Sequence, residues 1–210
     1  MPTFRRTCLV TAAPLLLAVA GLVHPHGLTR AAASHWEQLH IVLLPVFPLL
    51  TVGLLVPLRQ WPHRGFAGIA AVVAWVAAYA YAAFYTGLDA VAGIAAGTVV
   101  GHADEEANLG PLKRPLYETG QALGQIGAYA LVVAVLATAA ALFPWHGIRI
   151  IPGTVVLLAS GWSFIGSHIF WPRGVYTMLG FALGFALLNW GAGRSAVPLR
   201  RPHREGNRAH

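Results

Sequence analysis

The sequence predicts an all-α integral membrane protein, a helical bundle with six transmembrane helices. Of its 210 residues, 57% are hydrophobic and only 10% are charged, and the mean hydropathy is +0.62. Ordinary soluble domains carry about a quarter charged residues. A soluble fold of this size could not bury so much apolar surface, so the composition favours lipid as the surrounding solvent.

Six apolar segments define the expected helices. Each is close to the ~20 residues that a helix needs to cross the hydrocarbon core. The segments cover residues 7–24, 40–58, 66–88, 120–143, 150–171 and 174–191. We therefore expect a single membrane domain over residues 1–193, followed by a basic, disordered cytoplasmic tail over residues 194–210.

The first segment has a second interpretation. Arg5 and Arg6 precede an apolar stretch that ends near Ala18-Val19-Ala20, which is also the pattern of a cleavable signal peptide. Cleavage would leave five transmembrane helices and would keep the same face of the bundle outside.

The basic residues predict the orientation. With the N-terminus inside, the inner segments hold ten of the 14 basic residues, which satisfies the positive-inside rule. We therefore expect a multi-pass protein of the cell membrane with both termini in the cytoplasm. No basic stretch is interleaved with base-stacking aromatic residues, so the net charge of +7 does not indicate a nucleic-acid partner.

The outer connection over residues 89–119 is long enough to hold structure of its own. Gly93, Gly97 and Gly101 recur at four-residue spacing, which places them on one side of a helix and permits close packing. Residues 89–101 are too few for another crossing after residues 66–88. We therefore predict a short re-entrant or interfacial helix in this connection.

Histidines and acidic residues gather on the predicted outer side of the bundle. That side holds His24, His26, His35, His40, His102, His168, Glu37, Asp89, Asp104, Glu105, Glu106 and Glu118. Ionisable residues at membrane depth are costly and are functional candidates by default. The predicted metal ligands are His24, His40, His102 and His168, and the predicted catalytic carboxylates are Asp89 and Glu37.

Imidazole and carboxylate groups suit zinc, iron or copper, and two histidines on different helices could instead hold a b-type haem. The chain has no HExxH motif, and the lone Cys8 excludes a CxxC motif. Part of the pattern has a structural explanation, because Ser34 and Glu37 match a capping box at the start of the second helix. Gln121 and Gln125 lie at the matching outer depth, as does a line of serines that ends at Ser167.

The connection between the first two helices makes a geometric prediction. Pro25 and Gly27 end the first helix and Ser34 starts the second, so His24 and His40 should face each other while His35 points to solvent. His40, His168 and Asp89 should converge near the outer boundary.

These features favour a metal- or haem-dependent membrane enzyme or redox protein that acts on a small or lipid-like substrate. A metal-independent, acid-catalysed cyclase or isomerase of an isoprenoid remains an alternative, as does a small-solute transporter or accessory subunit. The expected partners are the lipid bilayer, a hydrophobic small molecule and a further copy of the chain in a homo-oligomer.

Overall fold

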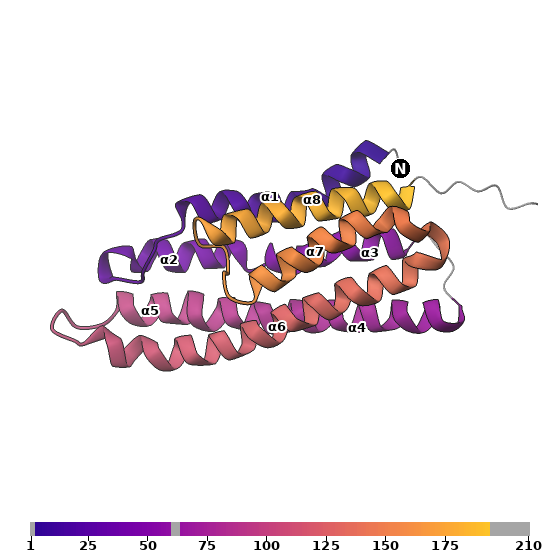
Figure 1. Ribbon diagram of the computed structural model, residues 1–210. Helices are drawn as coiled ribbons and strands as arrows, with labels where there is room; N and C mark the ends of the chain where they lie inside the picture. The colour runs from indigo at the N-terminus through magenta and orange to yellow at the C-terminus, as the bar shows by residue number, and fades with distance from the viewer. Residues whose placement is uncertain (1–2, 60–63, 194–210) are drawn as a thin grey trace, which may run out of the picture.

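Helices that run side by side make up the structure, a computed structural model that describes residues 3–59 and 64–193 (Figure 1). The described residues contain no strand, which confirms the predicted all-α class. In chain order the helices are α1 (Thr3–Val23), α2 (Arg30–Leu43), η1 (Phe47–Thr51), α3 (Val52–Leu58), α4 (Gly65–Leu88), η2 (Asp89–Ala95), α5 (Ala96–Gly101), α6 (Leu109–His146), η3 (Gly147–Ile150), α7 (Ile151–Phe164) and α8 (Arg173–Gly193). The predicted tail over residues 194–210 lies outside the described residues.

Five helical runs in the described residues are long and apolar enough to cross a membrane. They are Phe4–Val23, Arg30–Leu58, Gly65–Gly101, Leu109–Phe164 and Arg173–Gly193. The fourth run holds both α6 and α7, and the chain turns back between them near Gly147, which has a positive φ of 53° (Figure 1). The apolar helices are consistent with a membrane protein, whereas the count of six crossings stays a prediction.

The second helix begins one turn earlier than predicted. Thr29, not Ser34, is the N-cap residue of α2, and its side chain accepts a hydrogen bond of 3.2 Å from the backbone N–H of Ala32. The predicted capping box is therefore wrong. The helix can start at Thr29 because the threonine side chain offers the same capping oxygen as serine, four residues after Pro25. Ser34 therefore lies inside the helix, where its hydroxyl accepts a hydrogen bond from Gln38.

The second span is not one continuous α-helix. Pro45 and Pro48 interrupt it, because proline lacks a backbone N–H and clashes with the preceding turn. A short 3₁₀ helix, η1, joins α2 to α3 across this break. The irregular segment leaves the carbonyl oxygen of Phe47 free to accept a hydrogen bond of 3.0 Å from Tyr81 on α4.

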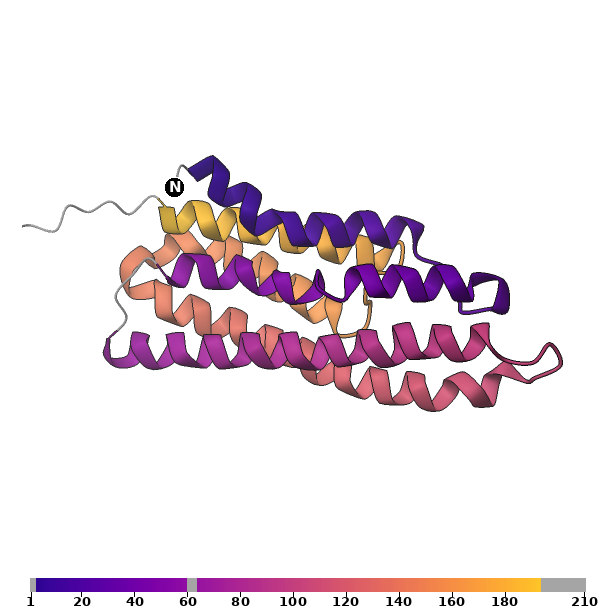
Figure 2. The ribbon, with the colours of Figure 1, turned by 180° about the vertical axis from the view of Figure 1, so that it is seen from behind.

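Residues 89–101 differ from the predicted separate short helix. They continue α4 through a π-helical turn, η2, and then through α5, so that one long helix runs beside α6 over the length of the bundle (Figure 2). The wider π turn places Asp89 on the buried side of this helix. Such turns are rare and frequently occur at functional sites.

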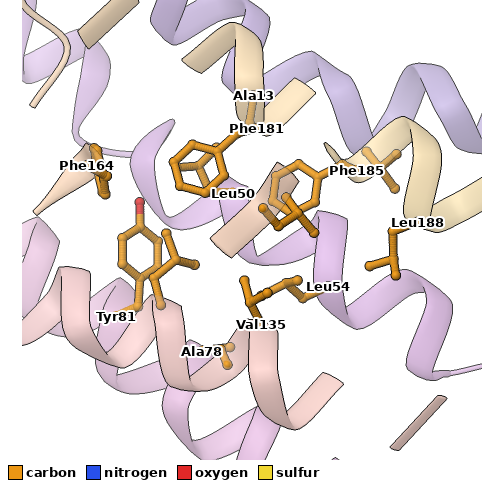
Figure 3. Close-up of a cluster of buried hydrophobic side chains, with 14 of the residues drawn as sticks. Ala13, Leu50, Leu54, Ala78, Tyr81, Val135, Phe164, Phe181, Phe185 and Leu188 are labelled. Atoms are coloured by element: carbon orange, nitrogen blue, oxygen red, sulfur yellow. The ribbon is translucent and has the colours of Figure 1, made fainter. Parts of the chain in front are cut away.

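A core of apolar side chains fills the middle of the bundle (Figure 3). Phe181 and Phe185 from α8 lie beside Leu50 and Leu54 from the second span, and all four are fully buried. The close approach of α7 to α8 depends on Gly153, since an added methyl there would lie 2.8 Å from the Cα of Leu188. The packing of this core fixes the relative positions of the helices, and polar residues lie at the ends of several of them.

Candidate metal centre

Three predicted ligands converge at one point of the structure. The side-chain nitrogens of His24, His40 and His168 that could bind an ion all lie within 4.8 Å of one another. His24 and His40 are buried, and His168 is partly buried. His24 and His168 lie in the α1–α2 and α7–α8 connections, which both lie toward the end of the bundle opposite the N-terminus (Figure 1, Figure 2).

Backbone carbonyls determine which nitrogen of two of these imidazoles is free. The Nδ1 of His24 lies 2.9 Å from the carbonyl oxygen of Pro25, and the Nδ1 of His40 lies 2.7 Å from that of Trp36. A carbonyl oxygen only accepts, so both Nδ1 atoms carry the proton. The two Nε2 atoms, which lie 3.5 Å apart, therefore present lone pairs to each other.

The imidazole of His24 is held in the neutral form. His24 follows the last residue of α1, outside the helical runs that could cross a membrane. Burial lowers its pKa to about 4, although the hydrogen bond to Pro25 acts in the opposite direction. A neutral imidazole is the form that binds a metal ion.

A buried carboxyl group lies next to one of these imidazoles. An oxygen of Asp89 lies 3.8 Å from the Nε2 of His40, and the residue is 0% exposed. Neither of its oxygens has a hydrogen-bond partner among the described residues. An unpaired buried carboxylate is strongly unfavourable, so Asp89 is either protonated or balanced by a cation at this point.

The third imidazole is held by an unusual backbone conformation. His168 has a positive φ of 45°, a region that residues other than glycine seldom adopt. Its Nδ1 lies 2.7 Å from the hydroxyl of Tyr85, which fixes the orientation of the ring. Strained residues of this kind cluster at functional sites.

The absence of a side chain at Gly93 leaves room for the side chain of His40. A methyl group at Gly93 would lie 2.7 Å from the Cβ of His40 and still closer to its ring. Further along the same face, Gly97 approaches the backbone of Glu37 and Gly101 approaches Ala33. The predicted close packing of the three glycines is confirmed, and its effect is to bring α2 against the π turn that carries Asp89.

These residues fit a single metal ion. Zn–N bonds of about 2.0–2.1 Å set the ligand atoms of a tetrahedral site about 3.4 Å apart. The spacings of 3.5 Å and 3.8 Å are near that value, and the ring nitrogen of His168 lies within 4.8 Å of those of His24 and His40. Two of the imidazoles also have the Nδ1–H to carbonyl bond that is typical of metal-binding histidines.

A cavity of about 450 Å³ adjoins this group of side chains. His40, Tyr85 and His168 lie on its wall, together with Gln121 and Gln125 from α6. Asp89 and His24 do not line it. A molecule in the cavity would therefore meet the histidine side of the centre and would not touch the carboxylate.

Two predicted site residues lie elsewhere. His102 is exposed at the end of α5, and its Nδ1 bonds to the carbonyl of Thr98. It follows Asp89 by thirteen residues of continuous helix, which separates the two by about 20 Å along the axis. Glu37 accepts a hydrogen bond of 2.9 Å from Thr98, so it ties α2 to α5 and does not join the centre.

The sequence reasoning missed two aromatic residues of the site. Tyr85 precedes Asp89 by one helical turn, and this spacing in the sequence indicates that the two side chains lie on the same side of the helix. Trp36 stacks on His40 with ring centres 5.0 Å apart and donates a hydrogen bond to the carbonyl of Ala92. Of the residues around it, His35 is exposed as predicted, and His24 faces the bundle whereas His26 is exposed.

No protein-family model, curated protein or solved structure matches this chain. The class of protein is therefore inferred from its apolar helices, and any function has to be proposed from the chemistry of the site.

Proposed function

We propose that this chain is a metal-dependent membrane enzyme or redox protein whose outward-facing centre binds one divalent transition-metal ion. His24, His40 and His168 supply three nitrogen ligands, and Asp89 supplies a carboxylate oxygen. Zinc, iron and copper all accept this donor set. In this proposal α6 and α7 each cross the membrane, which gives six spans with both termini in the cytoplasm.

One observation carries the proposal. Two imidazoles whose protons are committed to carbonyls face each other through their Nε2 lone pairs at 3.5 Å, beside an unpartnered buried carboxylate. Without a cation these groups repel one another in a region of low dielectric constant. A bound metal ion converts each of these unfavourable contacts into a coordinate bond.

The donor set favours a single ion over a haem. A haem iron takes its axial ligands from two sides and fills its equatorial plane with ring nitrogens. Here the ring nitrogens of His24, His40 and His168 lie within 4.8 Å of one another, and Trp36 packs directly on two of these imidazoles. The macrocycle would have to displace at least one of these groups.

A second candidate function is acid catalysis without a metal, as a protonated Asp89 would allow. Its complete burial and unpartnered oxygens favour this function. Asp89 does not line the cavity, however, so it could not protonate a molecule bound there without a rearrangement. The metal centre is therefore the function that we prefer.

The test is the metal content of the protein purified in mild detergent. We expect about one metal ion per chain by elemental analysis and no Soret band in the visible spectrum. His40→Ala should lose the metal, whereas the matched control His35→Ala, an exposed histidine on the same helix, should retain it. A protein that binds no stoichiometric metal after supply of zinc, iron or copper would refute the proposal.

A further inference from the structure

The size and lining of the cavity beside the centre indicate what kind of molecule it could bind. It holds about 450 Å³, which is within the usual range for small-molecule sites. Its wall combines the histidine side of the centre with residues of α6. The inference drawn from this cavity rests on the proposed metal centre only for the position of one ligand oxygen.

Hydrogen-bond donors from α6 line one side of the cavity. Gln121 and Gln125 are exposed, and neither carboxamide is bonded within the part of the chain that the structure describes. Lys113 donates one hydrogen bond to the carbonyl of Leu28, which leaves two of its three N–H groups for a ligand. A ligand with two acceptor oxygens could therefore bind α6 at one and the centre at the other.

Aromatic rings form much of the remaining wall. Trp36 lies beside Tyr117 and Phe170, with ring centres 6.3 Å and 6.2 Å away. Tyr85 stacks on Phe164 at 4.7 Å. Aromatic side chains favour offset-stacked or edge-on partners, so the surroundings suit a flat ring rather than a bare alkyl chain.

The charge of the cavity excludes one class of ligand. No aspartate or glutamate is among the described residues that line it, whereas Lys113 does line it. A cationic head group would meet Lys113 and a metal ion with no compensating carboxylate. An acceptor oxygen on an uncharged ring meets hydrogen-bond donors at the α6 end and would meet the proposed metal ion at the other end.

We propose that the cavity binds an amphiphile with a planar, uncharged ring bearing two carbonyl oxygens, the chemistry of a quinone. One oxygen lies on the side of His40 and His168, where the proposed metal ion would meet it, and the other accepts a hydrogen bond from Gln121 or Gln125. The ring lies among the aromatic side chains, and the apolar tail extends toward the lipid. The proposal concerns binding and specifies no reaction.

The test uses a tritiated decyl-benzoquinone and the full chain in lipid nanodiscs, with empty nanodiscs as the background. We expect saturable binding that unlabelled quinone displaces and that decylbenzene or decanoate does not. The double variant Gln121→Leu/Gln125→Leu should bind at least tenfold more weakly. Gln38→Leu, which removes an exposed glutamine on α2 outside the cavity, should bind like the unmodified chain.

Metal content is measured on the same samples, so the two proposals fail separately. Bound metal without saturable quinone binding would overturn this inference and leave the metal centre standing. Quinone binding without metal would overturn the metal centre. Equal displacement by decylbenzene would refute the requirement for carbonyl oxygens, and equal displacement by decanoate would refute the uncharged head group.

Discussion

The Nε2 atoms of His24 and His40 lie 3.5 Å apart although the two residues are sixteen positions apart in the chain. One imidazole follows the end of α1, and the other lies in the fourth turn of α2. Each donates its other ring proton to a nearby backbone carbonyl. The connection between the two helices thus holds two nitrogen lone pairs in a geometry that a metal ion would stabilise.

Gly93→Ala should weaken metal binding without unfolding the protein. The added methyl would collide with the side chain of His40 and force α2 away from the π turn. We expect metal affinity to fall at least tenfold, as it does when the support of a metal ligand is lost. The measurement is metal titration followed by elemental analysis.

Gly101→Ala is the control for this variant, since it lies on the same face but would place its methyl 3.6 Å from Ala33, an ordinary contact. Equal metal affinity in the two variants would contradict the positioning role of Gly93.

Asp89→Asn should have opposite effects on metal affinity and on the stability of the metal-free protein. The change removes a buried carboxyl group whose oxygens have no hydrogen-bond partner, and the new amide can donate to the Nε2 of His40. We expect weaker metal binding together with an unfolding temperature, measured without metal, that is equal or higher. A variant with unaltered metal affinity would show that the carboxylate is not a ligand.

Tyr85→Phe should lower metal affinity roughly 10- to 100-fold, the usual effect of removing a group that orients a ligand histidine. The change deletes the hydroxyl that lies 2.7 Å from the Nδ1 of His168. Tyr81→Phe is the matched control, because its buried hydroxyl bonds to the carbonyl of Phe47 and not to a histidine. If both variants lose metal equally, the effect comes from general destabilisation of α4.

Single cysteines test the proposed topology. In a Cys8→Ser background, a membrane-impermeant thiol reagent on intact cells should label Ala103→Cys, since the proposed topology places the α5–α6 connection outside the cell. Ser195→Cys should label only after the membrane is permeabilised. Labelling of both positions from the same side would contradict the orientation predicted from the basic residues.

The sequence by itself determined the class of the protein and the depth of its polar residues. Hydropathy and residue counting at 1.5 Å per residue are local properties, so the apolar helices and the common level of His24, His40, His168 and Asp89 could be predicted before the fold was known. The same counting failed for His102. The depth of His102 depends on whether the chain turns back after residues 66–88. The chain does not turn there, because the π turn continues α4 into α5 as one helix.

Only the tertiary structure decided which of these residues meet. The rotation of each helix about its axis depends on packing with its neighbours, such as the contact of Gly93 with His40, and single-helix periodicity cannot fix it. Which ring nitrogen of His24 and His40 is free depends in turn on backbone carbonyls near the helix ends. The position of His168 depends on its own positive φ in an irregular connection. These features arise from contacts between segments far apart in the chain, which is why the sequence pattern indicated candidate ligands but not the centre that they form.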